Sequence, residues 1–144
     1  MIAGVLMLVA IGATAQQRLL DPDSPESARP SAIQVLRLLA HGDIEAAAKA
    51  SNAPERRLEV FRDYRKRVGD DEFKQVFARY LETRVVAEVA LGPRRLIVWD
   101  LGESLSGQYF IEHDGRFVMD DVPSPARTEL ARILREYRSG YLKY

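Results

Sequence analysis

The sequence predicts an α+β fold, in which N-terminal helices pack on a curved antiparallel sheet of at least four strands and a C-terminal helix follows. Three observations lead to this prediction. Apolar residues recur at three- and four-residue spacing over residues 31–80, alternate with a period of two over residues 85–122, and return to helical spacing from residue 125. The 144-residue length and 47% hydrophobic content fit one domain with one core.

The first fifteen residues have the features of a signal peptide. They read MIAGVLMLVAIGATA, an uncharged apolar run that ends in the small-x-small pattern Ala13-Thr14-Ala15. Because a membrane-spanning helix needs roughly 20 apolar residues, we expect cleavage after Ala15 and no stable membrane span. A buried N-terminal helix of a cytosolic protein is the alternative interpretation.

The next segment, residues 16–30, contains three prolines and no regular apolar spacing. This composition predicts a flexible linker that precedes a single domain over residues 31–144. The chain has no cysteine, which excludes disulfides, thiolate metal sites and cysteine nucleophiles. Together with the signal peptide, this favours a soluble protein in the bacterial periplasm, or a secreted one.

Four helices are expected before the sheet, over residues 31–40, 44–50, 54–68 and 70–81. Ser31 with Gln34 and Asn52 with Glu55 have the spacing of capping boxes, and Asp43 has the position of a cap for the second helix. These signals predict a helical first half of the domain.

Four strands are expected next, over residues 85–91, 96–101, 108–113 and 116–122. The dipeptide Asp114-Gly115 tolerates the positive backbone angles of a type I′ turn, so the last two strands should form a tight antiparallel hairpin. A final helix should begin near Ser124-Pro125 and end before Gly140.

A first helix that ends in His41-Gly42-Asp43-Ile44-Glu45-Ala46-Ala47, more helix, and then long antiparallel hairpins resembles the nuclear transport factor 2-like superfamily over Ser31–Val122. The resemblance implies a curved sheet that wraps helices into a cone with a polar pocket at its open end. It also implies a binding or accessory role, as in exported bacterial members. A cystatin-like sheet with helices on one face is the nearest alternative.

The hairpin carries the candidate site. A two-residue loop places His113 opposite Arg116 and Tyr109 opposite Asp120. A phenol beside a carboxylate is suited to general acid/base chemistry or to orienting a ligand, so Tyr109 and Asp120 are the candidate catalytic pair. Five residues of this sheet form the expected binding set: Trp99, Asp100, Tyr109, His113 and Asp121.

The charge balance points to no nucleic-acid partner, because 21 basic residues match 21 acidic ones. The predicted third helix is locally basic and suits an acidic protein partner, so the expected partner surface comprises Arg56, Arg62, Arg65 and the C-terminal Tyr141. With two histidines in different halves of the chain and no acidic calcium loop, we expect neither a metal nor a cofactor.

These observations favour an exported, non-catalytic binding or accessory module. Its expected ligand is a protein, as for an inhibitor or an immunity protein, or a small apolar molecule in the cell envelope. A homodimer is a further expected form. A small-molecule enzyme that uses the Tyr109 and Asp120 pair is the alternative.

Overall fold

The computed structural model describes residues 17–139, which form five helices and one antiparallel sheet of five strands. The helices are α2 (Arg29–Ala40), α3 (Ile44–Lys49), α4 (Pro54–Val68), α5 (Asp70–Glu82) and α6 (Arg127–Ser139). The strands are β1 (Gln17–Leu19), β2 (Val85–Leu91), β3 (Arg94–Asp100), β4 (Leu105–His113) and β5 (Arg116–Met119). The predicted α+β class and C-terminal helix are confirmed. The predicted signal peptide lies outside the described residues.

The sheet is an open meander with the spatial order β1-β2-β3-β4-β5, so each strand pairs with its neighbours in the chain. The pairing of β2 with β3 is irregular between Val85 and Ala87, the kind of bulge that bends a strand. Among the residues described, no helix is both long and apolar enough to cross a bilayer.

The β4–β5 hairpin has the predicted register and turn. His113 is opposite Arg116, and both turn residues have positive φ, 51° at Asp114 and 79° at Gly115. A Cβ built on Gly115 meets no atom within 4 Å, so a larger residue there causes backbone strain without a steric clash.

Gly115→Val should therefore lower the free energy of unfolding by about 1 to 3 kcal/mol, because a β-branched residue is disfavoured at positive φ. Gly115→Asn is the matched control and should cost much less, since asparagine visits the left-handed region. Thermal unfolding of both variants measures the difference. Equal melting temperatures for Gly115→Val and the parent chain would contradict the turn assignment.

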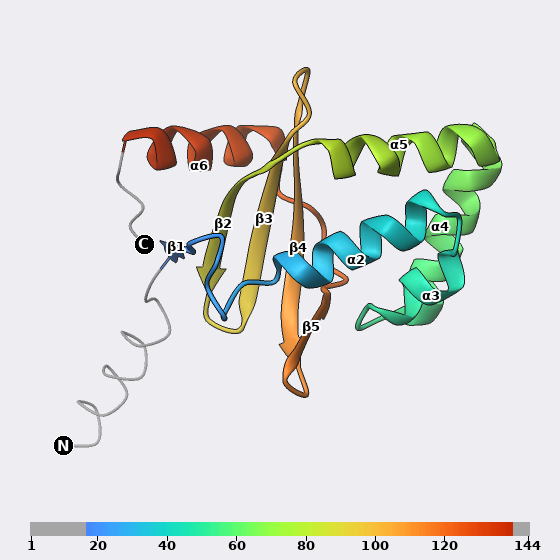
Figure 1. The fold of residues 1–144 in the computed structure, drawn as a ribbon, viewed down its shortest axis with the longest axis horizontal. Helices are drawn as coiled ribbons and strands as arrows, with labels where there is room; N and C mark the ends of the chain where they lie inside the picture. Colours follow the sequence, from blue (N-terminus) through green and yellow to red (C-terminus); the bar gives the residue numbers. More distant parts are fainter. Residues whose placement is uncertain (1–16, 140–144) are drawn as a thin grey trace.

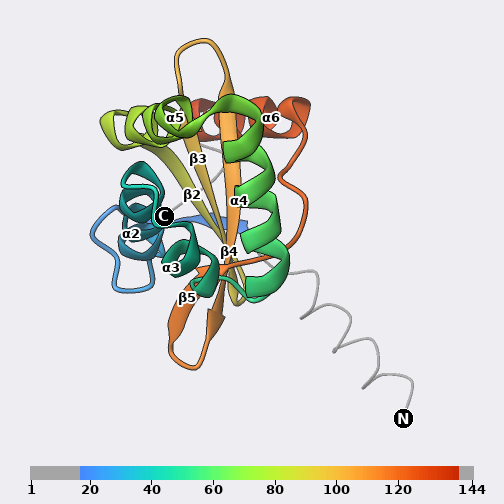
Figure 2. The same cartoon turned by 90° about the vertical axis from the view of Figure 1, so that its right-hand side faces the viewer.

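The two faces of the sheet pack against different helices. On one face, Ile97, Trp99 and Phe110 belong to a core shared with α2, α3, α4 and α5. On the other face, Leu96 and Val98 pack against Leu19 of β1 and against Leu130 and Ile133 of α6. In Figure 1, α6 extends to one side of the strands and α5 to the other, and Figure 2 shows α4 running roughly along the strand direction. The architecture thus has three layers: helices α2–α5, the sheet, and helix α6.

The segment predicted as a flexible linker is instead folded onto the sheet from Gln17 onward, which corrects the expected domain start. Its residues 17–19 form β1, and Leu19 and Leu20 are each 3% exposed. Arg18 forms an ion pair with Glu26 at 2.7 Å, and this hydrogen bond with its positive charge holds the pKa of the Glu26 carboxyl below its usual range. The irregular spacing that predicted a linker reflects tight turns around a short strand.

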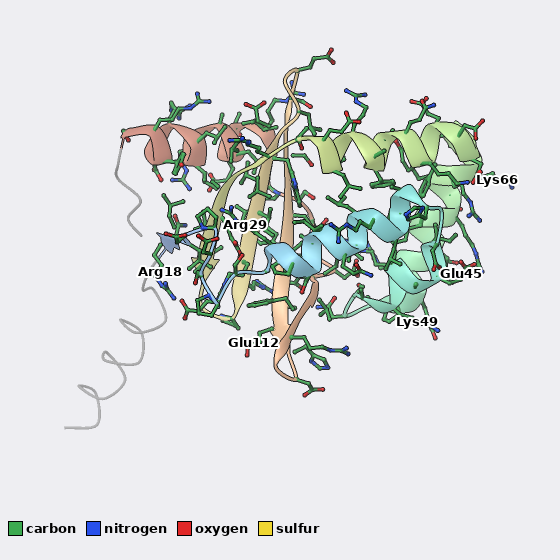
Figure 3. All side chains as sticks on the ribbon, viewed as in Figure 1. Arg18, Arg29, Glu45, Lys49, Lys66 and Glu112 are labelled. Carbon is green, nitrogen blue, oxygen red and sulfur yellow. The ribbon has the colours of Figure 1, made fainter. Side chains whose placement is uncertain are left out.

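A buried carboxylate explains why this segment is fixed. Glu88 of β2 is fully buried, and it accepts hydrogen bonds from the Ser27 hydroxyl at 2.5 Å, the Ala28 N–H at 2.7 Å and Arg29 Nε at 3.2 Å. Arg29 is labelled in Figure 3 near the start of α2. The helix begins there rather than at Ser31, because Pro30 suits its first turn and the carboxylate binds its N-terminal end.

Candidate functional site

A cavity of about 210 Å³ lies between helices α2, α4 and α5 and the sheet face that carries Trp99. Its walls are mostly apolar and include Ala32, Val35, Leu39, Phe61, Trp99 and Phe110. Larger hollows exist near α6, but charged surface side chains such as Arg127, Arg135 and Arg138 make up much of their lining. The cavity is the better candidate for a ligand, since ligand sites are mostly apolar with a few placed polar groups.

An aromatic row leads from α4 through α5 to the sheet, and its last three members, Phe77, Tyr80 and Trp99, line the cavity. The ring of Phe73 lies 5.7 Å from that of Tyr64 and 4.9 Å from that of Phe77. Tyr80 continues the row to Trp99, with centroids 5.6 Å apart and nearly perpendicular planes. Tilted and edge-to-face arrangements at these centroid distances are favourable for aromatic pairs, so the row stabilises the packing of α4 and α5 against the sheet.

Polar groups occur at a few points of this apolar lining. The Tyr80 hydroxyl and Ser106 Oγ are 2.8 Å apart and hydrogen-bonded, and the Gln108 side chain donates to the Tyr109 carbonyl at 3.0 Å. Arg57, from the first turn of α4, also lines the cavity, as does the exposed Ser124. Ser124 therefore places one end of the cavity at the protein surface.

The acidic pair after β5 is held by groups far away in the sequence. Asp120 is 2% exposed; its Oδ1 accepts from Asn52 Nδ2 at 2.9 Å, and its Oδ2 lies 2.7 Å from Arg94 Nε. The Asp121 N–H donates to Asn52 Oδ1 at 2.8 Å. Asn52 is thus not the predicted cap of α4, and β5 ends at Met119 rather than Val122 because the aspartates turn toward Asn52.

The predicted catalytic pair is adjacent only through its backbone. The Asp120 N–H donates to the Tyr109 carbonyl at 3.0 Å, as the predicted register requires. Within residues 17–139, however, no hydrogen bond joins the Tyr109 hydroxyl to Asp120, whose carboxylate contacts Asn52 and Arg94. These contacts join the hairpin end to the segment before α4 and to β3.

The predicted binding set is not brought together. Trp99 packs with the α2–α5 core and Tyr109 packs with the α6 core, so they lie on opposite faces of the sheet. Asp100 accepts from the Gly102 N–H in the next turn, and His113 is exposed at the hairpin tip beside Asp114. Of the five, Trp99 alone lines the cavity.

The predicted partner arginines have different environments. Arg56 is largely exposed and lies 3.1 Å from Asp121, while the half-buried Arg65 donates to the Gly42 carbonyl at 3.4 Å. Arg62 is exposed. Tyr141 lies outside the described residues.

Arg57 is the functional candidate that sequence reasoning missed. It is spaced four, seven and eleven residues from Phe61, Tyr64 and Val68, so it lies on the same helical stripe as these core residues. The sequence signal that could have identified Arg57 is a positive charge at a position where the apolar spacing predicts a core residue. Its partner Asp121 is distant in the sequence, beyond β5, so no local pattern connects the two residues.

Comparison of this chain with protein-family models, curated proteins and solved structures finds no match. In the part of the chain that the structure describes, no group of three or more histidine or acidic side chains is arranged to hold a metal ion.

Proposed function

We propose that this protein is an exported, non-catalytic binding module and that its ligand is a small molecule with an apolar body. The single observation that carries the proposal is the cavity between the α2–α5 helices and the sheet. Cavities of about 150 Å³ lined by apolar side chains bind benzene-sized molecules, so a volume of about 210 Å³ is sufficient for a compact ligand.

Packing supports a functional reason for this cavity. Protein interiors are close-packed, and an unfilled volume forfeits dispersion contacts on every side. Phe110, which lines the cavity, is 2% exposed, so the cavity borders the buried core. A ligand that occupies the cavity would restore the missing contacts.

The proposal extends to family and location. Membership in the nuclear transport factor 2-like superfamily is proposed from the order of elements in the sequence, and the fold shares the expected layout of helices on one face of an antiparallel sheet. The apolar N-terminus with Ala13-Thr14-Ala15 supports export to the periplasm or outside the cell.

Filling the cavity tests the proposal. Ala32 is 1% exposed and lines the cavity, so Ala32→Leu should reduce the affinity for fluorobenzene about tenfold or more by occupying its space. Arg37→Leu, on the exposed side of the same helix, is the matched control and should bind like the parent chain. Fluorine NMR line broadening of fluorobenzene measures binding. Absence of binding to the parent chain, or equal binding to Ala32→Leu, would refute the cavity assignment.

A protein ligand is the second candidate. Val60 of α4 is 43% exposed among charged neighbours, and an apolar side chain with a charged rim is typical of a protein contact. Such a partner would contact the outer surface, so Ala32→Leu would leave its affinity unchanged.

A further inference from the structure

The guanidinium of Arg57 has fewer acceptors than its burial requires. The side chain is 17% exposed and lines the cavity, and its Nε is buried without a hydrogen-bond acceptor among residues 17–139. Asp121 Oδ1 lies 3.4 Å from this Nε without forming a hydrogen bond to it. A buried donor without an acceptor is unfavourable, so this Nε favours a ligand that supplies one.

The local charges do not cancel at this end of the cavity. Asp121 also lies 3.1 Å from Arg56 Nε through its other oxygen, so one carboxylate is shared by two arginines. Asp120 is paired with Arg94 at 2.7 Å. In this group of ion pairs three arginines share two aspartates, a net charge of one positive, and within the group Arg57 is the residue that lines the cavity.

We propose that the ligand is a monocarboxylate whose apolar body lies against Trp99 and whose carboxylate binds Arg57. This inference rests on the proposed function and specifies its ligand class. The planar guanidinium fork matches a carboxylate through two parallel hydrogen bonds, and one negative charge balances the excess. The apolar walls near Phe61 and Phe110 bind the rest of the molecule.

Two probes of nearly equal size and shape test the inference, one an anion and one neutral: 4-fluorobenzoate and 4-fluorobenzamide, titrated by fluorine NMR into the whole protein. The parent chain should bind the benzoate about tenfold or more tightly, since charge-assisted hydrogen bonds are about twice as strong as neutral ones. Arg57→Met should abolish this preference and retain binding of the amide. Arg62→Met removes an exposed arginine from the same helix, and this variant should retain the preference for the benzoate over the benzamide.

Asp121→Asn provides an independent variant. It removes the competing negative charge while the Asp121 backbone bond to Asn52 is kept, so it should increase benzoate affinity several-fold and leave benzamide affinity unchanged. Equal affinities of the parent chain for the two probes, or unchanged benzoate affinity in both Arg57→Met and Asp121→Asn, would overturn the inference. If fluorobenzene binds and the benzoate does not, the carboxylate assignment fails and the proposed function stands. If none of the three probes binds, both fail.

Discussion

Glu88→Ala should lower the free energy of unfolding by about 3 to 5 kcal/mol, because removing one member of a buried ion pair leaves its partners without compensation. The Ser27 hydroxyl, the Ala28 N–H and Arg29 all donate to this carboxylate, and no water reaches the fully buried side chain to replace it. The N-terminal segment should loosen with it, so trypsin should cleave after Arg18 faster than in the parent chain.

Urea denaturation followed by fluorescence measures this loss, because Trp99 is the chain's one tryptophan and is 4% exposed in the core. Glu112→Ala removes an exposed glutamate of β4, labelled in Figure 3, and should change stability by less than about 0.5 kcal/mol. A loss below about 1 kcal/mol for Glu88→Ala, or trypsin cleavage at the parental rate, would show that Glu88 does not fasten the segment.

Phe73→Ala should lower the free energy of unfolding by about 3 to 5 kcal/mol, the usual cost of removing a buried phenylalanine side chain. Phe73 is completely buried and lies between Tyr64 and Phe77, so its deletion interrupts the aromatic row and leaves a void between α4 and α5. The midpoint of urea denaturation should fall without a change in its slope, because the folded state keeps its compactness.

Two comparisons sharpen this prediction. Phe73→Leu preserves much of the buried volume and should lose less stability than Phe73→Ala. Leu81→Ala, a truncation of a residue on the same helix that is 37% exposed, should change stability by less than about 0.5 kcal/mol. If Phe73→Ala and Leu81→Ala were equally stable, the aromatic row would not be the centre of this core.

Local signals were accurate where a short stretch of sequence controls its own conformation. Asp43 caps α3 by accepting from the Ala46 N–H, and Gly69 ends α4 with a φ of 91°. The Asp114-Gly115 turn sets the hairpin register through two adjacent residues. In each case the deciding interaction spans at most a few residues, so the sequence pattern carries it.

The predicted cap of α4 was wrong because its side chain bonds to residues far away in the sequence. Asn52 has the spacing of a helix cap, but its amide bonds to Asp120 and to the backbone of Asp121, some 68 residues away. Ser51 Oγ accepts from the Ala53 N–H just before α4, and no side chain caps this helix. A side chain can satisfy either a local or a distant group, and its spacing alone does not distinguish them.

The sequence by itself determined the α+β class, the order of helices and strands from α2 onward, the tight hairpin and the absence of cysteine chemistry. Apolar periodicity, glycine and turn residues act over one or two turns of chain, and they need no tertiary information. Tertiary structure alone decided that Trp99 and Tyr109 face opposite ways, that residues 17–28 join the sheet through Glu88, and that Arg57 lies beside Asp121 at an apolar cavity. The contacts of Glu88 and Arg57 join segments about 60 residues apart in the chain. Leaving either charged group unpaired in a buried position would cost free energy, so the fold that pairs them is favoured.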